Sequence, residues 1–284
     1  QYNVTHFNFV GTGMAFMMVQ PESPQDPITP VRVIHNAMGT PELIQAWSKR
    51  FQIKVVMIYN LTECALATGT PISGPHPVKY GSIGWPAASQ PFPTQVRVVD
   101  EKGQDAKPNE IGEIIIRGPA LMKGYYKQPD KTKETVKDGW LYSGDAGWRD
   151  EDGCLWFSDR IKDMVKPKGE NVASAEVEGV IGAHPQVADI GVIGVMDPMT
   201  REEIKASILL KEGQTPETVP PQQIIEWCQA RLAKFKVPRF YEYRDKPVPR
   251  ILGGAKILKR EMRLEKKDNP TQGCYDMRKG AWLS

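Results

Sequence analysis

The chain has 284 residues, of which 40% are hydrophobic and 25% are charged, with a formal net charge of +3. This length and composition allow a buried core in one or two domains, and the interleaved charges argue against a basic surface for nucleic acid. No apolar run approaches the roughly 20 residues of a membrane-spanning helix. The four cysteines, Cys64, Cys154, Cys228 and Cys274, lack CxxC pairing and metal-ligand spacing. We therefore expect a globular, cytoplasmic protein without a disulfide scaffold.

Residues 1–77 predict a layered α/β segment. The amphipathic residues 1–20 predict a helix, and the proline-rich stretch 22–30 predicts a loop. A strand over Val31–Ile34, a helix over Pro41–Phe51 and a buried strand over Lys54–Ile58 follow. Alternation of strand and helix is typical of an α/β layer.

Residues 78–160 predict a small antiparallel barrel or distorted sheet, because short apolar runs alternate there with turn residues. The predicted strands are Val96–Val99, Gly112–Arg117, Trp140–Tyr142 and Cys154–Phe157. Residues 161–265 predict a compact α+β domain after a hinge. Its predicted elements are a helix over Ala175–Ala183, strands over Ile190–Val195 and Lys205–Leu210, and a helix over Pro221–Leu232. For the tail 266–284 the sequence predicts no role.

Several motifs occur in one order along residues 5–265. They are Tyr59–Glu63, Gly81–Gly84, Gly112–Pro119, Tyr142–Asp145, Ser158–Asn171 and a late lysine, Lys256. Together they resemble the adenylate-forming superfamily of acyl-CoA synthetases, luciferases and peptide-synthetase adenylation domains, and within it the crotonobetaine/carnitine-CoA ligase group. The resemblance implies an α/β plus α+β fold: a partial adenylation domain, with an α/β layer and a small β-barrel, followed by a mobile C-terminal domain.

The resemblance assigns five positions to ATP, AMP and Mg²⁺. Tyr59 stacks on adenine, Thr62 offers its hydroxyl to a phosphate, and Glu63 offers a hard oxygen ligand to Mg²⁺. Asp145 accepts hydrogen bonds from both ribose hydroxyls, and Arg160 gives the nucleotide a forked donor. Structural alternatives are a core tyrosine at a strand end, a helix cap formed by the Thr-Glu pair, and an internal Asp to Arg ion pair.

A sixth nucleotide position and the mobile domain's residues come from the same resemblance. Gly39 belongs to the segment 36–39 that wraps the adenine edge, where Asn36 and Met38 depart from the commoner small residues. Lys256 reaches the substrate carboxylate and the α-phosphate, where negative charge grows in the transition state. One extra residue separates it from the preceding proline motif, and Lys259 is a runner-up that composition places on a solvated face.

The segment around the hinge is assigned to thioester formation with CoA. The C-terminal domain rotates about Lys162, and the Gly169 loop then replaces the late lysine, because glycine permits close approach of the pantetheine arm. Lys166 lies on the thioester-forming face. By composition alone these lysines form an ordinary basic loop.

The implied reaction is AMP-forming ligation of a carboxylic acid to CoA, with no nucleic-acid partner. The superfamily's Ser/Thr/Gly-rich phosphate-gripping loop is expected upstream of the first motif and is absent from the printed sequence, so we expect weak or no adenylation by these 284 residues alone. The alternative is a truncated nucleotide-binding or interaction module without ligase activity. Transfer to a carrier protein differs only in the acceptor. An apolar surface exposed by truncation also predicts self-association, for example as a homodimer.

Overall fold

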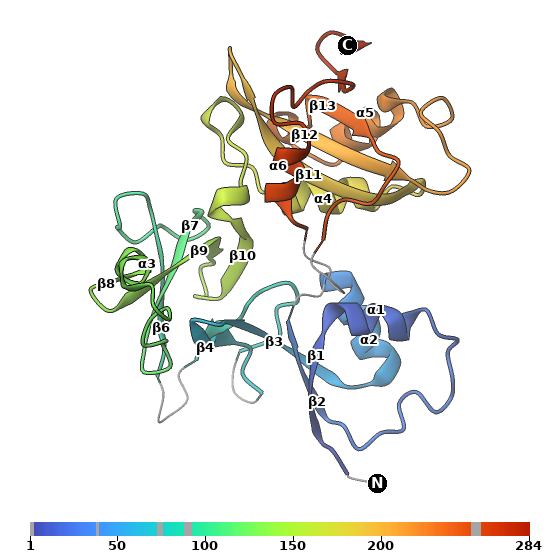
Figure 1. Ribbon diagram of the computed structural model, residues 1–284. Coiled ribbons are helices and arrows are strands. Elements are labelled where there is room, and N and C mark those ends of the chain that lie inside the picture. The colour runs from blue at the N-terminus through green and yellow to red at the C-terminus, as the bar shows by residue number, and fades with distance from the viewer. Residues whose placement is uncertain (1–2, 38–39, 73–75, 88–92, 251–256) are drawn as a thin grey trace. The chain divides into compact units, whose positions relative to one another are not determined.

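The computed structural model describes residues 3–37, 40–72, 76–87, 93–250 and 257–284. The chain forms two compact units, Gln1–Phe157 and Ser158–Ser284. The strands form three sheets, and Figure 1 labels most of these strands. The finer subdivision of the first unit at residues 77 and 78 stays a prediction.

The first sheet is five-stranded, in the order β1-β2-β3-β4-β5. Its strands are β1 (His6–Val10), β2 (Val33–Ala37), β3 (Lys54–Leu61), β4 (Cys64–Gly69) and β5 (Trp85–Pro86). β1, β2 and β3 run parallel, whereas β4 and β5 are added antiparallel. Helix α1 (Gly11–Met18) follows β1, so the expected helix over residues 1–20 is wrong for its first part. Pairing with β2, a partner more than 20 residues away, makes residues 6–10 a strand.

Helix α2 (Pro41–Phe51) connects β2 to β3 and confirms the predicted boundaries. Thr40 caps it by accepting a hydrogen bond from the backbone N–H of Leu43, and proline occupies the first helical position. Ile44, Trp47 and Phe51 lie on one face and are buried. Burying such side chains stabilises the unit by roughly 1.5–3 kcal/mol each. Their core also contains Met14 of α1 and residues of β2 and β3.

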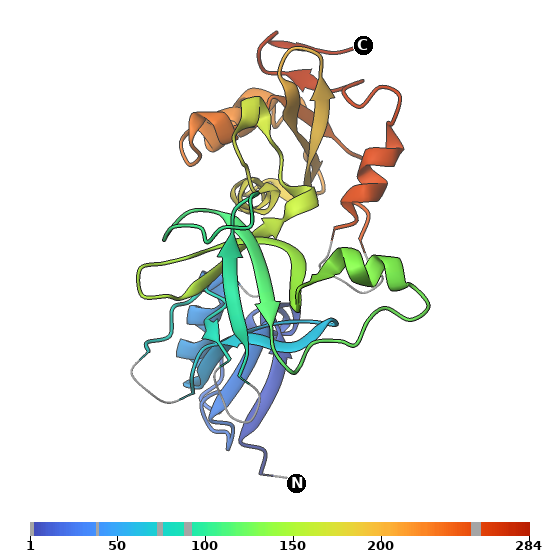
Figure 2. The same cartoon turned by 90° about the vertical axis from the view of Figure 1, so that its left-hand side faces the viewer.

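The second sheet contains the predicted antiparallel strands, in the order β10-β9-β7-β6 with β8 paired to β9. The strands are β6 (Gln95–Val99), β7 (Gly112–Arg117), β8 (Val136–Lys137), β9 (Trp140–Arg149) and β10 (Leu155–Arg160). Figure 2 shows the short helix α3 (Pro129–Thr135), in green, beside these strands. The sheet's buried residues share one core with Cys64 and Ala67 of β4, so the first two sheets form a single packed unit.

The second unit is built on the third sheet, in the order β11-β12-β13-β14-β15. The strands are β11 (Val187–Asp197), β12 (Arg201–Leu210), β13 (Phe240–Tyr243), β14 (Tyr275–Asp276) and β15 (Ala281–Trp282). Helices α4 (Ser174–Gly182) and α5 (Pro221–Gln229) contribute to one core and α6 (Lys259–Glu265) to another. Neighbouring strand residues alternate between the cores: Val192 and Tyr241 belong to the first, Ile193 and Phe240 to the second. Short 3-10 helices span Ile161–Asp163 (η1), Pro167–Gly169 (η2) and Lys234–Lys236 (η3).

The tail beyond residue 265 is part of this sheet. β14 pairs with β13, and β15 pairs with β14, both antiparallel. Cys274 is fully buried in the core that also contains Met262. No helix among the described residues has both the length and the apolar character that crossing a bilayer requires.

Candidate functional site

The Tyr59–Glu63 motif forms the end of β3 and the turn that follows it. Leu61 pairs with Cys64, so Thr62 and Glu63 are the two residues of a tight hairpin turn between β3 and β4. Thr62 is exposed and Glu63 is half-buried. The helix-cap alternative for Thr62 and Glu63 is therefore wrong, because no helix starts here.

The Tyr142–Asp145 motif forms a bulge in β9. Tyr142 pairs with Ile115 and Ala146 pairs with Glu113, so four steps along β9 span two steps along β7. Gly144 has a φ of 70°, a conformation that favours glycine. Its N–H donates to the Glu113 carboxylate (3.0 Å). The bulge directs Asp145 inward, and Asp145 is 1% exposed.

Hydrogen bonds from Ser143 hold the bulge in place. The Ser143 hydroxyl donates to the carbonyl of Ile114 (2.6 Å) and accepts from the backbone N–H of Asp145 (3.0 Å). Pairing of β9 with β7 therefore resumes at Ala146, and the hydrogen bonds of Ser143 fix the backbone of Asp145 just before it.

The structure brings the two motifs together at one contact. The Tyr59 phenol donates a hydrogen bond to Asp145 Oδ2 over 2.5 Å. Tyr59 is half-buried, so its ring is packed along one part and accessible along another. The core-tyrosine alternative therefore describes only part of its environment. The β3–β4 hairpin contributes the partly accessible ring of Tyr59 and the Thr62–Glu63 turn. The β9 bulge contributes the buried carboxylate of Asp145.

Glu63 has a partner that the sequence did not reveal. Its Oε1 accepts a hydrogen bond from the Tyr125 phenol (2.6 Å), and its carbonyl accepts from the backbone N–H of Met122 (2.7 Å). Lys131 lies over the Tyr125 ring at 4.5 Å. Tyr125 belongs to no recognised motif, and Glu113 lies in the Gly112–Pro119 motif without an assigned role, so only the fold shows that they support the site.

The second unit holds the other described site residues. Arg160 ends β10 and is half-buried, whereas Lys162 in η1, Lys166 and Gly169 are exposed. The Lys162 carbonyl accepts from Arg263, which also pairs with Asp163 (both 3.2 Å). Arg263 belongs to α6, so the hinge segment is bonded to that helix.

The Gly169 loop borders a hollow of about 750 Å³. The hollow is lined by Lys166, Lys168, Gly169, Met196, Met199, Thr200, Arg201 and Glu202. The backbone N–H of Lys166 donates to Glu202 Oε2 (2.7 Å), which fastens the loop to β12. Three basic side chains and two exposed methionines give this surface the character of a site for a ligand with both anionic and apolar parts.

Two predicted site residues, Gly39 and Lys256, lie outside the described residues. Lys259 is described, and its placement on a solvated face is wrong, because it is 7% exposed. Its ammonium lies 3.0 Å from Glu178 and donates to the Ser174 hydroxyl, which in turn donates to Asp159. Burial raises the pKa of Glu178. Lys259 therefore closes a buried polar network inside the second unit.

Two family models match the chain. The AMP-binding enzyme model matches residues 1–126, and the AMP-binding enzyme C-terminal domain model matches residues 176–250. The chain belongs to the AMP-binding enzyme family. Tyr59, Thr62 and Glu63 fall within the first match, whereas Asp145 and the residues from Arg160 to Gly169 lie between the two.

Curated and solved members of the AMP-binding enzyme family resemble the chain along nearly its whole length. The crotonobetaine/carnitine-CoA ligase of Citrobacter koseri is 34% identical over 269 residues, which are 93% of this chain and 50% of that protein. ATP-bound MatB from Rhodopseudomonas palustris superposes with a TM-score of 0.79 at 29% identity, covering 93% of this chain and 51% of MatB. The AMP complex of O-succinylbenzoate CoA synthetase from Bacillus subtilis gives a TM-score of 0.75 at 27% identity, over 91% and 50% of the two chains. The chain thus spans about half the length of the relatives it matches.

The site fits a nucleotide and Mg²⁺ on chemical grounds. Among the described residues, no group of three His, Cys, Asp or Glu side chains is placed to hold a metal by itself. Mg²⁺ characteristically takes one or two carboxylates together with phosphate oxygens and water. Glu63 supplies such a carboxylate, with Oε1 oriented by Tyr125, at the tip of the β3–β4 turn. In an AMP-binding enzyme this arrangement suits a cation carried by the nucleotide.

Proposed function

We propose that this chain carries the ribose and adenine side of the nucleotide site, together with the thioester-forming domain, of an AMP-forming acyl-CoA ligase. The observation that supports this most directly is the 2.5 Å contact between Tyr59 and Asp145, which joins an aromatic face to a buried carboxylate. These groups suit adenine stacking and the two ribose hydroxyls, respectively. The family match adds the ligase class.

In the first half-reaction, a substrate carboxylate oxygen attacks the α-phosphorus of ATP. The bond to the bridging oxygen breaks, and pyrophosphate leaves with that electron pair. Thr62 donates to a phosphate oxygen, and Glu63 would hold Mg²⁺, which would neutralise phosphate charge. Lys256 is assigned to the substrate carboxylate and the α-phosphate.

In the second half-reaction, the CoA thiolate attacks the carbonyl carbon of the acyl-adenylate, and AMP leaves. Gly169 admits the pantetheine arm, because it has no side chain and a φ of 90°. Lys166, Lys168 and Arg201 around the hollow offer positive charge to the CoA phosphates. Lys162 is the proposed pivot between the half-reactions.

The first experiment is calorimetric titration of the 284-residue chain with ATP and with AMP in Mg²⁺, beside Asp145→Ala. We expect binding by the unchanged chain and none by the variant. Binding that survives Asp145→Ala would place the nucleotide elsewhere. Absence of binding by the unchanged chain would contradict a preassembled half-site in these residues.

A companion titration separates the metal role of Glu63. Glu63→Gln removes the charge and keeps the side chain's size, so ATP affinity is expected to lose its dependence on Mg²⁺ while AMP affinity changes little. Glu134→Gln, an exposed position on α3, is the matched control. Equal Mg²⁺ dependence in Glu63→Gln and in the control would contradict the assignment.

Pyrophosphate release with ATP, Mg²⁺ and candidate acids tests catalysis itself. Weak or absent release by these residues is expected, because the printed sequence has no Ser/Thr/Gly-rich phosphate loop. Robust turnover would overturn that expectation. Nucleotide binding without turnover, even when the remainder of a relative's adenylation domain is supplied, would instead favour a non-catalytic nucleotide-binding module.

A further inference from the structure

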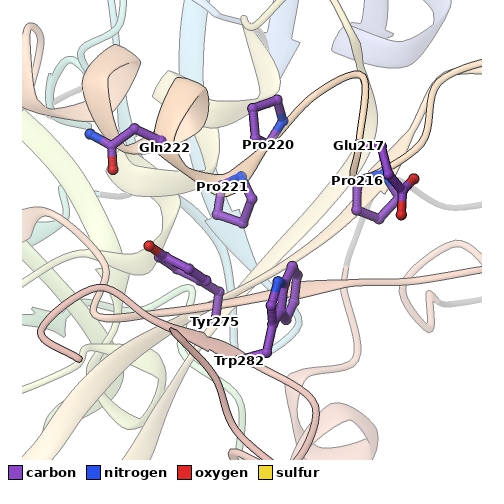
Figure 3. Close-up of a pocket in the computed structure, with 7 residues that line it drawn as sticks. All are labelled: Pro216, Glu217, Pro220, Pro221, Gln222, Tyr275 and Trp282. Atoms are coloured by element: carbon purple, nitrogen blue, oxygen red, sulfur yellow. The ribbon is translucent and has the colours of Figure 1, made fainter. Parts of the chain in front are cut away.

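The C-terminal hairpin β14–β15 belongs to none of the recognised motifs, yet two sets of contacts anchor it. Figure 3 shows Tyr275 and Trp282 on one side of a hollow of about 520 Å³, with Pro220 and Pro221 on the other. The two aromatic rings meet edge to face, with centroids 5.6 Å apart. Asp276, the next residue after Tyr275, points to the opposite face of the strand and is fully buried.

Asp276 accepts hydrogen bonds from two nitrogens of the Arg239 guanidinium. Arg239 Nε donates to Asp276 Oδ1 (3.2 Å), and Arg239 Nη2 donates to Asp276 Oδ2 (3.1 Å). A forked pair of this kind fixes the orientation of the arginine as well as its position. The remaining nitrogen, Nη1, is thereby aimed in a defined direction.

That third nitrogen reaches the turn between β11 and β12. Arg239 Nη1 donates to Asp197 Oδ2 over 2.8 Å. The other oxygen of Asp197 accepts from the backbone N–H of Met199 (3.0 Å) and from the N–H and hydroxyl of Thr200 (2.9 Å each). One carboxylate therefore shapes the whole turn, and Arg239 holds that carboxylate.

A second bridge runs parallel to the first. Arg278, two residues after Asp276, pairs with Glu203 Oε1 (2.6 Å). The same Glu203 oxygen lies 2.7 Å from the Thr200 hydroxyl, whose single hydrogen is shared between Glu203 and Asp197, and Glu203 is 4% exposed. The tail thus reaches the β11–β12 turn through two ion-pair contacts, which are linked to each other because Arg239 also lies 3.6 Å from Glu203.

The β11–β12 turn is the wall of the hollow beside Gly169. Met196, Met199, Thr200, Arg201 and Glu202 line that hollow opposite the Lys166–Gly169 loop. We propose that Asp276 is a positioning residue for CoA: through Arg239 it holds the β11–β12 turn in the shape that completes the hollow. This inference rests on the assignment of the hollow to CoA in the proposed function.

Hydrogen–deuterium exchange with CoA titration tests the inference on the 284-residue chain. Asp276→Asn keeps the side chain's size but removes the charge that orients Arg239. We expect amide exchange within residues 197–203 to accelerate about tenfold, and CoA affinity to fall by a similar factor, a typical size for coupling through a contact network. Affinity for AMP, which is assigned to the first unit, is expected to stay unchanged.

Three further variants make the test specific. Asp276→Glu keeps the charge and is expected to restore part of the protection. Arg278→Gln breaks only the second bridge at a side chain that is 40% exposed, so it probes the turn even if Asp276→Asn fails to fold. Trp282→Ala disturbs the aromatic side of the hairpin and is the control expected to leave exchange at 197–203 unchanged.

Unchanged exchange at 197–203 in both Asp276→Asn and Arg278→Gln would overturn the inference. The inference would also be overturned if amide exchange accelerated evenly over the second unit and to the same extent in Trp282→Ala. That result would show that Asp276 stabilises the unit as a whole and not the turn in particular. If the unchanged chain binds no CoA, the assignment of the hollow fails, whereas the exchange comparison still decides whether Asp276 holds the turn.

Discussion

Tyr59 and Asp145 are 86 residues apart in the chain and share a hydrogen bond of 2.5 Å between phenol and carboxylate. One residue belongs to the first sheet and the other to the second, so this contact depends on the two sheets packing as one core. The carboxylate that is assigned to ribose is therefore oriented by the ring that is assigned to adenine. This coupling makes the two residues testable as a pair.

Replacing Tyr59 by Phe keeps the ring and removes the donor. We expect the free energy of unfolding to fall by about 1.5–3 kcal/mol, as for hydrogen bonds to charged groups. AMP affinity is expected to fall about tenfold, because Asp145 loses its fixed orientation. Urea unfolding and AMP titration measure the two effects. Tyr126→Phe, at a residue that is 84% exposed, is the control, and equal behaviour of both variants would contradict the role of the contact.

Two glycines of β9 are expected to respond differently to alanine. Gly144 has a φ of 70° and open space around its Cα, so Gly144→Ala costs only the backbone conformation, about 1–2 kcal/mol. A Cβ at Gly147 would lie 2.3 Å from the Trp156 carbonyl oxygen and 2.7 Å from Ile114 Cδ1. Gly147→Ala is therefore expected to cost about 3 kcal/mol or more. Urea unfolding of both variants checks the order, and a reversed order would contradict the packing described here.

The four thiols are expected to be inert in the folded protein. Cys64, Cys154, Cys228 and Cys274 are each at most 1% exposed. Burial raises the pKa of every one, that of Cys228 to about 12, and the thiolate is the reactive form. A chromogenic disulfide reagent at pH 8 should therefore titrate no thiol before denaturation and four afterwards. Rapid labelling of any native thiol would contradict their burial.

Acid should destabilise the second unit through Glu242. Burial alone would raise the pKa of this carboxyl, but hydrogen bonds from Lys266 and Ser207 and the charge of Lys205 outweigh it and hold the pKa at about 2. Because the folded pKa lies below the unfolded one, the stabilisation is complete above about pH 4.5 and is lost as the pH falls towards 2.

Urea unfolding at pH values between 7 and 2.5 measures this loss. The Lys266→Met variant, which lacks the 2.6 Å contact with Glu242, is expected to lose less stability over the same range. Identical pH profiles for the variant and the unchanged chain would contradict the role of this ion pair.

Local sequence signals were sufficient to predict an element when all of its signals lie within the element itself. Helix α2 has a capping threonine, an N-terminal proline and buried residues at helical spacing, and its boundaries were predicted correctly. Residues 6–10 were predicted as helix because their pairing partner β2 is distant in sequence. The tail was left without a role for the same reason, since β14 and β15 have two residues each and exist only through pairing with the sheet.

The site residues likewise fall into those that a motif predicts and those that only the packing of the fold reveals. The motifs predict that Tyr59 and Asp145 belong to one site, whereas their direct contact follows from sheet packing. Tyr125 carries no local signal, and the motif that contains Glu113 assigned it no role, since a tyrosine or glutamate becomes a supporting residue only through a partner elsewhere. Lys259 looked solvated because its partners lie on α4 and in the segment around Asp159.

The two outer strands of the third sheet differ in length, and each limits unwanted pairing with another chain. β15 offers only two residues to a neighbour, too few to serve as a template. β11 is 11 residues long, but the backbone N–H of Val192 is already bonded to the Glu178 carboxylate over 2.9 Å. A glutamate that also pairs with Lys259 thus occupies a backbone donor that would otherwise be open to a strand of another chain.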